Sequence, residues 1–230
     1  VKDIEIIAVN DGSKDDSLTI LKNYQQKYPS IIKIIDKENG GLGMARNRGL
    51  KIARGRFVMF LDSDDAYAVD ALESLYWESI KFDCDMVYGR IGLEIDGQLV
   101  PQENLEKKLS KHLGRRYSNL RQDTGTIFYN VVCTLYKREL LENNGIRFPE
   151  GILWEDMPFA IQAWNHSKMI GYVPNIVYYR TMREDSLSRK ANYRQVKDRI
   201  VVTELINDYF NKYNIHNMFN YFKWSIDDIE

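Results

Sequence analysis

Residues that commonly form cross-links or zinc sites are scarce in this 230-residue sequence, which has two cysteines and three histidines. Cys84 and Cys133 lie in apolar surroundings without a paired metal-binding spacing, so we expect buried free thiols in a reducing compartment rather than a disulfide. The histidines are scattered without the spacing of metal ligands, and we expect ordinary surface or core residues. These counts therefore indicate neither a disulfide scaffold nor a zinc centre.

A strong net charge and long apolar runs are also absent. The 32 basic and 33 acidic residues give a formal net charge of −1, so nothing in the overall field indicates binding to nucleic acid. No stretch approaches the roughly 18–20 apolar residues of a membrane-spanning helix, and no signal-peptide pattern opens the chain. We predict a cytoplasmic chain without a transmembrane segment, with peripheral attachment to the inner face of the membrane as an alternative.

What is present is the composition of a folded globular protein. Hydrophobic residues make up 44% and charged residues 28% of the chain, which leaves no case for disorder or a fibrous repeat. The length suits one sizeable domain with a small appendage. We expect a main domain over residues 1–190 and a C-terminal helical extension over residues 191–230, where apolar residues recur at helical spacing.

Strand-like and helix-like segments alternate along the first 90 residues. Near-continuous apolar runs, typical of strands covered on both faces, are each followed by a polar turn and a segment with helical spacing. This alternation predicts an α/β fold with an open, mostly parallel sheet flanked by helices. The expected strands are Ile4–Val9, Ile31–Ile35, Phe57–Leu61 and Cys84–Gly89, and one expected helix is Leu42–Ala53.

The pattern is looser after residue 89. The segment Gly92–Val100 resembles a hairpin that turns at Asp96 and Gly97. Residues 101–122 are strongly charged, and we expect them to form a surface insertion. The remaining expected elements are a strand and a short helix within residues 125–141, a helix over Trp154–Trp164 and a strand over Tyr172–Tyr179.

An acidic cluster follows the third expected strand, with Asp62, Asp64 and Asp65 within four residues. Crowded carboxylates repel one another unless a cation is present, and hard oxygen ligands favour Mg²⁺ or Mn²⁺. Such an ion would neutralise the charge that grows on a departing nucleoside diphosphate. The alternative is that these residues cap a helix beginning near Val69, because Asp and Ser are good N-cap residues.

Two segments nearer the N-terminus carry candidate ligand groups. Asp11 also follows a strand, and because ligands of open α/β sheets bind beyond the carboxyl ends of the strands, we expect it to share a crevice with the acidic cluster. Arg46 stands where a dinucleotide fingerprint needs its third glycine. Arg46 and Arg48 are instead candidates for facing an anionic or planar ligand, and a solvent-facing position is an equal alternative for Arg48.

Two later segments also carry candidate groups. Glu155 and Asp156 lie at the start of an expected helix, where a carboxylate can take the proton of an acceptor hydroxyl. The alternative is a charge that only complements the helix macrodipole. Arg180 and Arg183 lie in a segment after a strand, where arginine can bind phosphate with two hydrogen bonds, and a plain surface loop is the alternative.

Four segments, in this order, resemble bacterial family 2 glycosyltransferases of the inverting, GT-A-fold kind: IEIIAVNDGSKDDSLTIL, ENGGLGMARNRGLKIARGRFVMFLDSDD, WEDMPF and YYRTMREDSLS. The resemblance covers residues 3–190. It implies a Rossmann-like nucleotide-diphospho-sugar transferase fold with C-terminal helices. It also implies transfer of a sugar, with inversion, from a nucleotide-sugar donor, commonly a UDP-sugar, to a hydroxyl of a glycan or lipid-linked acceptor in cell-surface polysaccharide synthesis.

The resemblance implies roles for the donor side of the site. Asp11 would contact the nucleobase, and Arg46 would lie beside the base or ribose. Asp62 and Asp64 match the family's D-x-D motif, with Asp64 the more direct ligand of Mn²⁺ or Mg²⁺ and Asp62 nearer the ribose or in the outer surroundings of the ion. Asp65 would support them.

The acceptor side and the diphosphate are assigned in the same way. Asp156 matches the carboxylate that serves as general base, with Glu155 orienting or contacting the acceptor. Arg180 and Arg183 would reach the diphosphate from a closing loop. A nucleotidyltransferase and a non-catalytic nucleotide- or glycan-binding subunit stay open as alternatives.

The sequence departs from the family pattern at its start. The pattern opens with an earlier strand and a P-x-Y-N-like turn, and neither precedes Val1. Because that strand lies centrally in the family's sheet, we expect an incomplete nucleotide pocket and reduced activity. An exposed strand edge favours pairing with another chain, so we also expect self-association.

Overall fold

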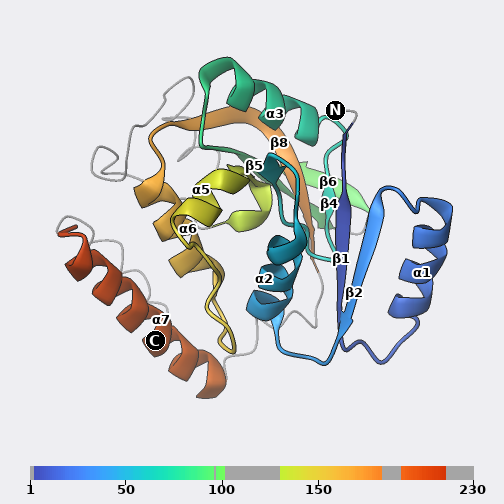
Figure 1. The fold of residues 1–230 in the computed structure, drawn as a ribbon, viewed down its shortest axis with the longest axis horizontal. Helices are drawn as coiled ribbons and strands as arrows, with labels where there is room; N and C mark the ends of the chain where they lie inside the picture. The colour runs from blue at the N-terminus through green and yellow to red at the C-terminus, as the bar shows by residue number, and fades with distance from the viewer. Residues whose placement is uncertain (1–2, 96, 102–129, 183–192, 216–230) are drawn as a thin grey trace.

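The computed structural model describes residues 3–95, 97–101, 130–182 and 193–215, and these form an α/β fold with strands between helices (Figure 1). The described strands form a two-stranded sheet, β1-β2, and a six-stranded sheet in the order β3-β7-β5-β8-β4, with β6 paired to β5. The predicted α/β class is therefore confirmed. Almost all of the charged segment expected over residues 101–122 lies outside the described residues.

The N-terminal unit alternates strand and helix as predicted. Strands β1 (Ile6–Asp11) and β2 (Ile32–Lys37) pair in parallel, and helix α1 (Ser17–Lys27) connects them. Parallel neighbours need such a crossover connection. Helix α2 (Leu42–Ile52) follows and packs beside β1, while α1 packs beside β2 (Figure 1).

The larger sheet mixes parallel and antiparallel pairs. Strand β5 (Met86–Ile95) runs parallel to β8 (Ile170–Thr181) and antiparallel to β6 (Gln98–Pro101) and β7 (Thr134–Lys137). The expected hairpin is confirmed by β5 and β6, whose short connection forces antiparallel pairing. Of the six described strand pairs, two are parallel and four antiparallel, so the described pairing is mixed rather than mostly parallel.

The third expected strand, Phe57–Leu61, pairs over only two residues. Strand β3 (Phe57–Val58) pairs with β7 at one edge of the larger sheet, and the next strand, β4 (Ala66–Tyr67), pairs with β8 at the opposite edge. Residues 59–65 therefore cross the sheet between its two edges. This segment, which we call the acidic loop, carries the acidic cluster.

Helices and aromatic side chains enclose the larger sheet. Helix α3 (Ala71–Phe82) packs on β8 and β5, and α5 (Arg138–Asn143) follows β7 and contacts α6 (Asp156–His166). The largest fully buried side chains include five aromatic ones: Trp164, Tyr88, Tyr136, Tyr178 and Phe159. Cys84 and Cys133 are buried thiols that form no disulfide, as predicted.

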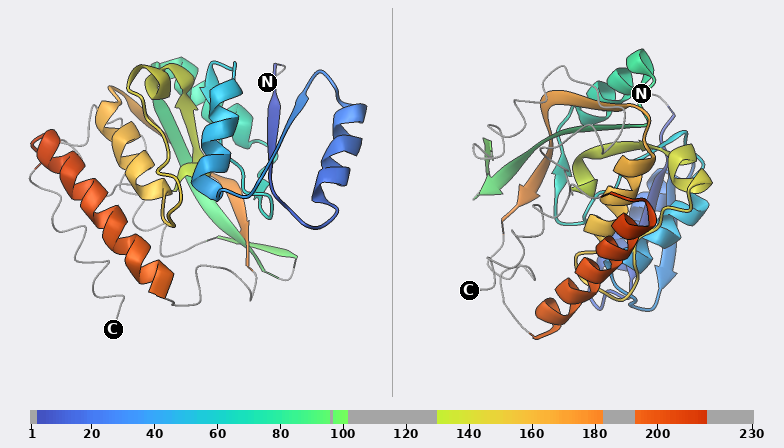
Figure 2. Two further views of the ribbon diagram at one scale, coloured as in Figure 1. Left: turned by 60° about the horizontal axis from the view of Figure 1, so that its bottom comes forward. Right: turned by 90° about the vertical axis from the view of Figure 1, so that its left-hand side faces the viewer.

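The last described helix, α7 (Tyr193–Lys212), packs against α6 (Figure 2). Its buried residues Val202, Ile206 and Phe210 belong to the same hydrophobic cluster as the sheet. The predicted helix is therefore present, but Val196, Ile200 and Leu205, which were expected on its packed face, are exposed. The residues on which the predicted boundary between residues 190 and 191 falls lie outside the described part of the chain.

One edge of β1 has no partner strand among the residues described, because β1 pairs only with β2 there. Self-association through this edge stays a prediction. None of the helices described is both long enough and apolar enough to cross a membrane.

Candidate active site

The acidic loop is held against β8 by Asp65. The carboxylate of Asp65 accepts hydrogen bonds from the Tyr178 hydroxyl, at 2.6 Å, and from the backbone N–H of Thr181, at 2.8 Å. The backbone N–H of Asp62 in turn donates to the Tyr178 oxygen at 3.3 Å. Burial, and then the hydrogen bond to Asp65, raise the pKa of Tyr178, so this hydroxyl stays protonated as a donor. Asp65 thus anchors the loop.

The helix-cap alternative for the acidic cluster is wrong. Helix α3 begins at Ala71 with Asp70 at its N-cap position, so none of the three carboxylates of the cluster caps it. Asp64 is exposed and makes no hydrogen bond or ion pair with any residue that the structure describes. Both of its oxygens are therefore available to a ligand with respect to the described residues, whereas Asp62 has one oxygen, Oδ1, bound to Arg46.

Arg46 joins the acidic loop to the start of α6. Its Nη2 lies 2.8 Å from Oδ1 of Asp62, and its Nη1 lies 2.7 Å from Oε1 of Glu155. Arg46 is 9% exposed, and its guanidinium lies over the Phe148 ring, 5.2 Å from the centroid. Burial opposes the charged form, but the carboxylates of Asp62 and Glu155 raise the pKa of Arg46. The result is a buried cation shared between two carboxylates.

The two carboxyl groups at the start of α6 are both harder to ionise than in water. Burial raises the pKa of Glu155 despite the nearby guanidinium of Arg46. Burial, and then the negative charge of Glu155, raise the pKa of Asp156 to about 6. Asp156 also lies in the first turn of α6, where a negative charge complements the macrodipole, so the two interpretations made from the sequence are compatible.

Helix α7 fixes the segment that leads into α6, which the sequence did not indicate. The buried carboxylate of Asp198 accepts a hydrogen bond from the backbone N–H of Leu153 at 3.0 Å. The next residue, Trp154, has a φ of 65°, a left-handed conformation that is uncommon for a bulky side chain, and Arg199 lies 5.0 Å from its ring centroid. The sequence did contain one signal for this role: Asp198 lies four residues before Val202, where the buried apolar stripe of α7 begins, and therefore lies on the same face of the helix.

Asp11 binds the turn that leads into α2. Its carboxylate accepts hydrogen bonds from the backbone N–H groups of Gly40, at 3.0 Å, and Gly41, at 2.8 Å, and forms an ion pair with Lys37. Burial opposes ionisation, but Lys37 and the two N–H groups lower the pKa of Asp11 overall. Asp11 therefore stays charged and braces the N-terminus of the helix that carries Arg46.

The predicted site residues thus divide into groups. Contacts in the structure bring together Arg46, Asp62, Glu155 and the adjacent Asp156. The exposed residues of the prediction are Arg48, Asp64 and Arg180, and Arg183 lies outside the described residues. Asp11 does not contact these four residues. It binds the turn before α2, the helix that carries Arg46.

Comparison with known proteins decides the family. The family model described as "Glycosyl transferase family 2" matches residues 1–145. The chain belongs to this glycosyltransferase family. Membership favours sugar transfer over the nucleotidyltransferase alternative.

Curated relatives of this family 2 chain include proteins named for teichoic acid biosynthesis and for glucosyl transfer to poly(ribitol-phosphate). It is 34% identical over 226 residues to the minor teichoic acid biosynthesis protein GgaA of Bacillus subtilis, covering 93% of this chain and 49% of that protein. It is 32% identical over 199 residues to the poly(ribitol-phosphate) beta-glucosyltransferase of Bacillus spizizenii, covering 84% of this chain and 29% of that protein. The chain spans about half or less of the length of these relatives.

A solved structure shares the fold. The crystal structure of S. aureus TarS 1-349 in complex with UDP-GlcNAc matches with a TM-score of 0.66 and 25% identity, covering 90% of this chain and 64% of that chain. This similarity confirms the predicted GT-A architecture.

Proposed function

We propose that this chain is the catalytic part of an enzyme that transfers a sugar from a UDP-sugar to a hydroxyl acceptor with inversion. The observation that supports it best is the pair of ion pairs made by Arg46, which join Asp62 of the acidic loop to Glu155. These ion pairs bring the acidic loop next to the start of α6. We infer that the loop binds the nucleotide diphosphate and that Asp156 faces the acceptor. Sugar transfer needs both groups in one site.

A divalent cation, Mn²⁺ or Mg²⁺, fits this site when the donor is bound. The described residues include no group of three or more Asp, Glu, His or Cys side chains that would hold an ion alone. Mg²⁺ usually binds through one or two carboxylates together with substrate phosphates, and Mn²⁺ accepts the same oxygen ligands. Asp64, with Asp62 two residues away, would supply the carboxylates. The ion would neutralise charge on the departing diphosphate.

Asp156 is the proposed general base. A base with a pKa of about 6 is ionised at neutral pH and still basic enough to accept a proton. As the acceptor oxygen forms its bond to the anomeric carbon, Asp156 takes the hydroxyl proton, and the bond from that carbon to the UDP oxygen breaks. Attack and departure on opposite faces of the sugar invert the configuration.

The names of similar proteins support the proposed donor and stereochemistry. The matched structure holds UDP-GlcNAc, and the Bacillus spizizenii relative is named for beta-glucosyl transfer to poly(ribitol-phosphate). UDP-glucose and UDP-GlcNAc carry alpha-linked sugars, so a beta-linked product requires inversion. We extend this chemistry to the present chain, with a cell-wall or other surface polymer as the acceptor. Asp11 would then bind the nucleobase, and Arg180 with Arg183 the diphosphate.

A screen of UDP-sugars tests the proposal, with release of UDP measured in the protein at its full natural length. Asp156→Asn should lower the rate by about 10²–10⁴-fold while UDP still binds. Asp208→Asn, which changes an exposed carboxylate on α7, is the matched control and should leave the rate unchanged. Asp64→Asn should weaken UDP binding in the presence of Mn²⁺.

Two outcomes count against the proposal. If Asp156→Asn is as active as the unmodified protein, the assignment of the base is wrong. If the unmodified protein binds UDP but releases it from no UDP-sugar, the chain is better described as a non-catalytic nucleotide-binding subunit.

A further inference from the structure

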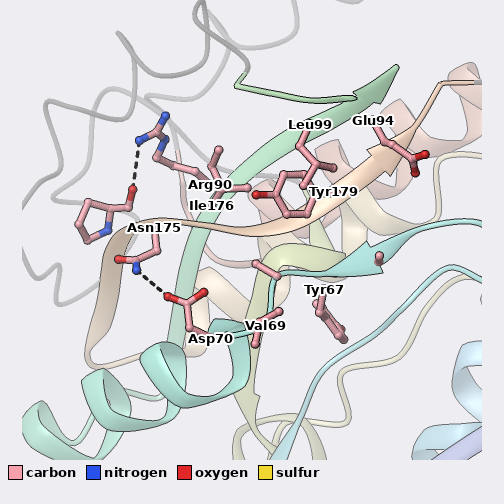
Figure 3. Close-up of a pocket in the computed structure, with 12 residues that line it drawn as sticks. Tyr67, Val69, Asp70, Arg90, Glu94, Leu99, Asn175, Ile176 and Tyr179 are labelled. Atoms are coloured by element: carbon pink, nitrogen blue, oxygen red, sulfur yellow. Dashed lines mark hydrogen bonds between the residues drawn. The ribbon is translucent and has the colours of Figure 1, made fainter. Parts of the chain in front are cut away.

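A pocket of about 670 Å³ lies on one face of the larger sheet, at the start of α3 (Figure 3). Its volume falls within the roughly 300–1,000 Å³ typical of sites for small ligands. The lining begins at Ala66, the residue that follows Asp65 of the acidic loop, and continues onto β5, β6 and β8. It includes neither Arg46 nor Asp156, so it is distinct from the site described above.

The floor of the pocket is an aromatic ring between two very small residues. Tyr179 on β8 is paired with Ala66 on β4 and with Gly92 on β5. A Cβ atom added to Gly92 would lie 2.8 Å from both Cδ1 and Cε1 of the Tyr179 ring. The ring therefore lies over Gly92, and only the absence of a side chain there allows it to rest so close to the sheet. The result is a flat aromatic platform.

The walls of the pocket combine apolar and polar groups. Leu99, on β6, is 57% exposed, and Val69 is fully exposed. In the part of the chain that the structure describes, apolar side chains beside the Tyr179 ring are therefore open to solvent. Asn175 donates a hydrogen bond to Asp70 at 3.0 Å (Figure 3). An apolar platform with a few oriented polar groups is the usual pattern of a ligand site.

We propose that this pocket binds a neutral sugar residue of the acceptor glycan, with the apolar face of the sugar ring on Tyr179. The hydroxyl groups of a sugar can donate to carboxylates and accept from amides, which matches Asp70, Glu94 and Asn175. The lining carries two carboxylates and one guanidinium, that of Arg90, so a polyanion would meet excess negative charge. This inference rests on the proposed function, because it assigns the pocket to the acceptor of that reaction.

The pocket is coupled to the acidic loop through Thr181. The backbone N–H of Thr181 donates to Asp65, and its hydroxyl donates to Glu94 in the pocket lining at 3.0 Å. A glycan in the pocket therefore lies beside the loop that is proposed to hold the donor. We infer that the pocket holds a sugar of the acceptor chain other than the one that reacts.

Direct binding of defined oligosaccharides tests the proposal without any need for catalysis. The probes are cellohexaose, maltohexaose and N-acetylchitohexaose, with poly(ribitol phosphate) as the charged comparison, titrated by calorimetry and ligand-observed NMR. At least one neutral probe should bind, and Tyr179→Ala should weaken it by about tenfold, as expected for loss of an aromatic contact. Tyr179→Phe should bind within about threefold of the unmodified protein, because the ring face is kept.

Two further variants guard against a general effect on folding. Tyr24→Ala removes an exposed tyrosine on α1, 55% exposed, and should leave binding unchanged. Leu99→Glu alters an exposed wall residue and should also weaken binding, so it carries the test if Tyr179→Ala does not fold. The proposal is overturned if no neutral probe binds at millimolar concentration, if binding survives both pocket variants, or if only poly(ribitol phosphate) binds.

Release of UDP from a UDP-sugar without acceptor separates this proposal from the proposed function. That reaction uses water in place of the glycan, so Tyr179→Ala should release UDP at the normal rate while the KM for a glycan acceptor rises. Release of UDP without oligosaccharide binding would refute only the pocket assignment. Oligosaccharide binding that depends on Tyr179, without release of UDP, would refute the proposed transfer reaction instead.

Discussion

Replacing Arg46 with methionine removes the cation that links the acidic loop to α6. Glu155 is 6% exposed, so its carboxylate would be left in a site that little water reaches. Removing one partner of a buried ion pair costs about 3–5 kcal/mol, because the other charge stays buried and unpaired. Methionine keeps an unbranched chain and a good helix propensity. We therefore expect the free energy of unfolding to fall by about 3–5 kcal/mol at neutral pH.

This loss should shrink as the pH is lowered. Burial already raises the pKa of Glu155 while Arg46 opposes that rise, so removing Arg46 should raise the pKa further. A carboxyl group with a higher pKa in the folded state binds protons more tightly there than in the unfolded chain. The variant should therefore regain stability as the pH falls through the folded pKa towards the unfolded value of about 4.3.

Urea denaturation followed by tryptophan fluorescence, at neutral and at mildly acidic pH, measures both effects. Arg48→Met is the matched control, because Arg48 is exposed on the same helix and should change stability by no more than about 0.5 kcal/mol. Adding Glu155→Gln to Arg46→Met should restore part of the loss, since the buried charge is then gone. The reasoning is refuted if Arg46→Met destabilises no more than Arg48→Met, or if its effect is independent of pH.

Three further predictions follow from single contacts. A profile of kcat/KM for transfer against pH should fall below about pH 6, because burial raises the pKa of Asp156 to about 6 and the base must be ionised. Asp198→Ala should slow transfer by about ten- to hundredfold without weakening UDP binding, whereas Asp198→Asn should keep most of the rate, because its amide oxygen still accepts from Leu153. In urea denaturation Gly43→Ala should lower the free energy of unfolding by about 1–3 kcal/mol, because the added Cβ would lie 2.4 Å from a backbone carbonyl oxygen. Gly49→Ala is the control: the atom nearest to its added Cβ is 3.6 Å away, so this variant should raise the free energy of unfolding by about 0.5–1 kcal/mol.

Each of these has a contrary result. A flat pH profile across pH 6 would exclude Asp156 as the ionising base. Equal rates for Asp198→Ala and the unmodified protein would show that α7 does not position the start of α6. If Gly43→Ala and Gly49→Ala change stability by the same amount, the close approach at Gly43 is not a constraint.

Local patterns in the sequence predicted the elements whose signals are local. The apolar runs of β1 and β2 and the helical spacing of α2 were sufficient to predict these elements, because such patterns are visible within a few residues. The expected burial of both strand faces is not found, since most residues of β1 and β2 are only partly buried. The run Phe57–Leu61 was misjudged as one strand. An apolar run indicates that its residues are shielded from water, but not where hydrogen bonding to a neighbouring strand ends. Here β3 ends at Val58, and the chain then crosses the sheet.

The sequence predicted that these motifs belong to one site, but not the contacts that join them. Glu155 lies 109 residues from Arg46, and no local pattern specifies such a contact. The same holds for Asp65, whose donors on β8 are more than 110 residues away. Asp198 was missed because its role depends on the packing of α7 against the segment before α6 rather than on a motif of its own.

The configuration of the sugar first released by hydrolysis gives the most direct test of the proposed reaction. The UDP-sugar that gives the fastest UDP release would be hydrolysed by the full-length protein, and the anomeric proton followed by ¹H NMR before mutarotation. If Asp156 activates water for a single displacement, the beta anomer appears first, and Asp156→Asn slows its appearance by at least about a hundredfold. Initial release of the alpha anomer, or an unchanged rate in Asp156→Asn, would contradict the proposed mechanism.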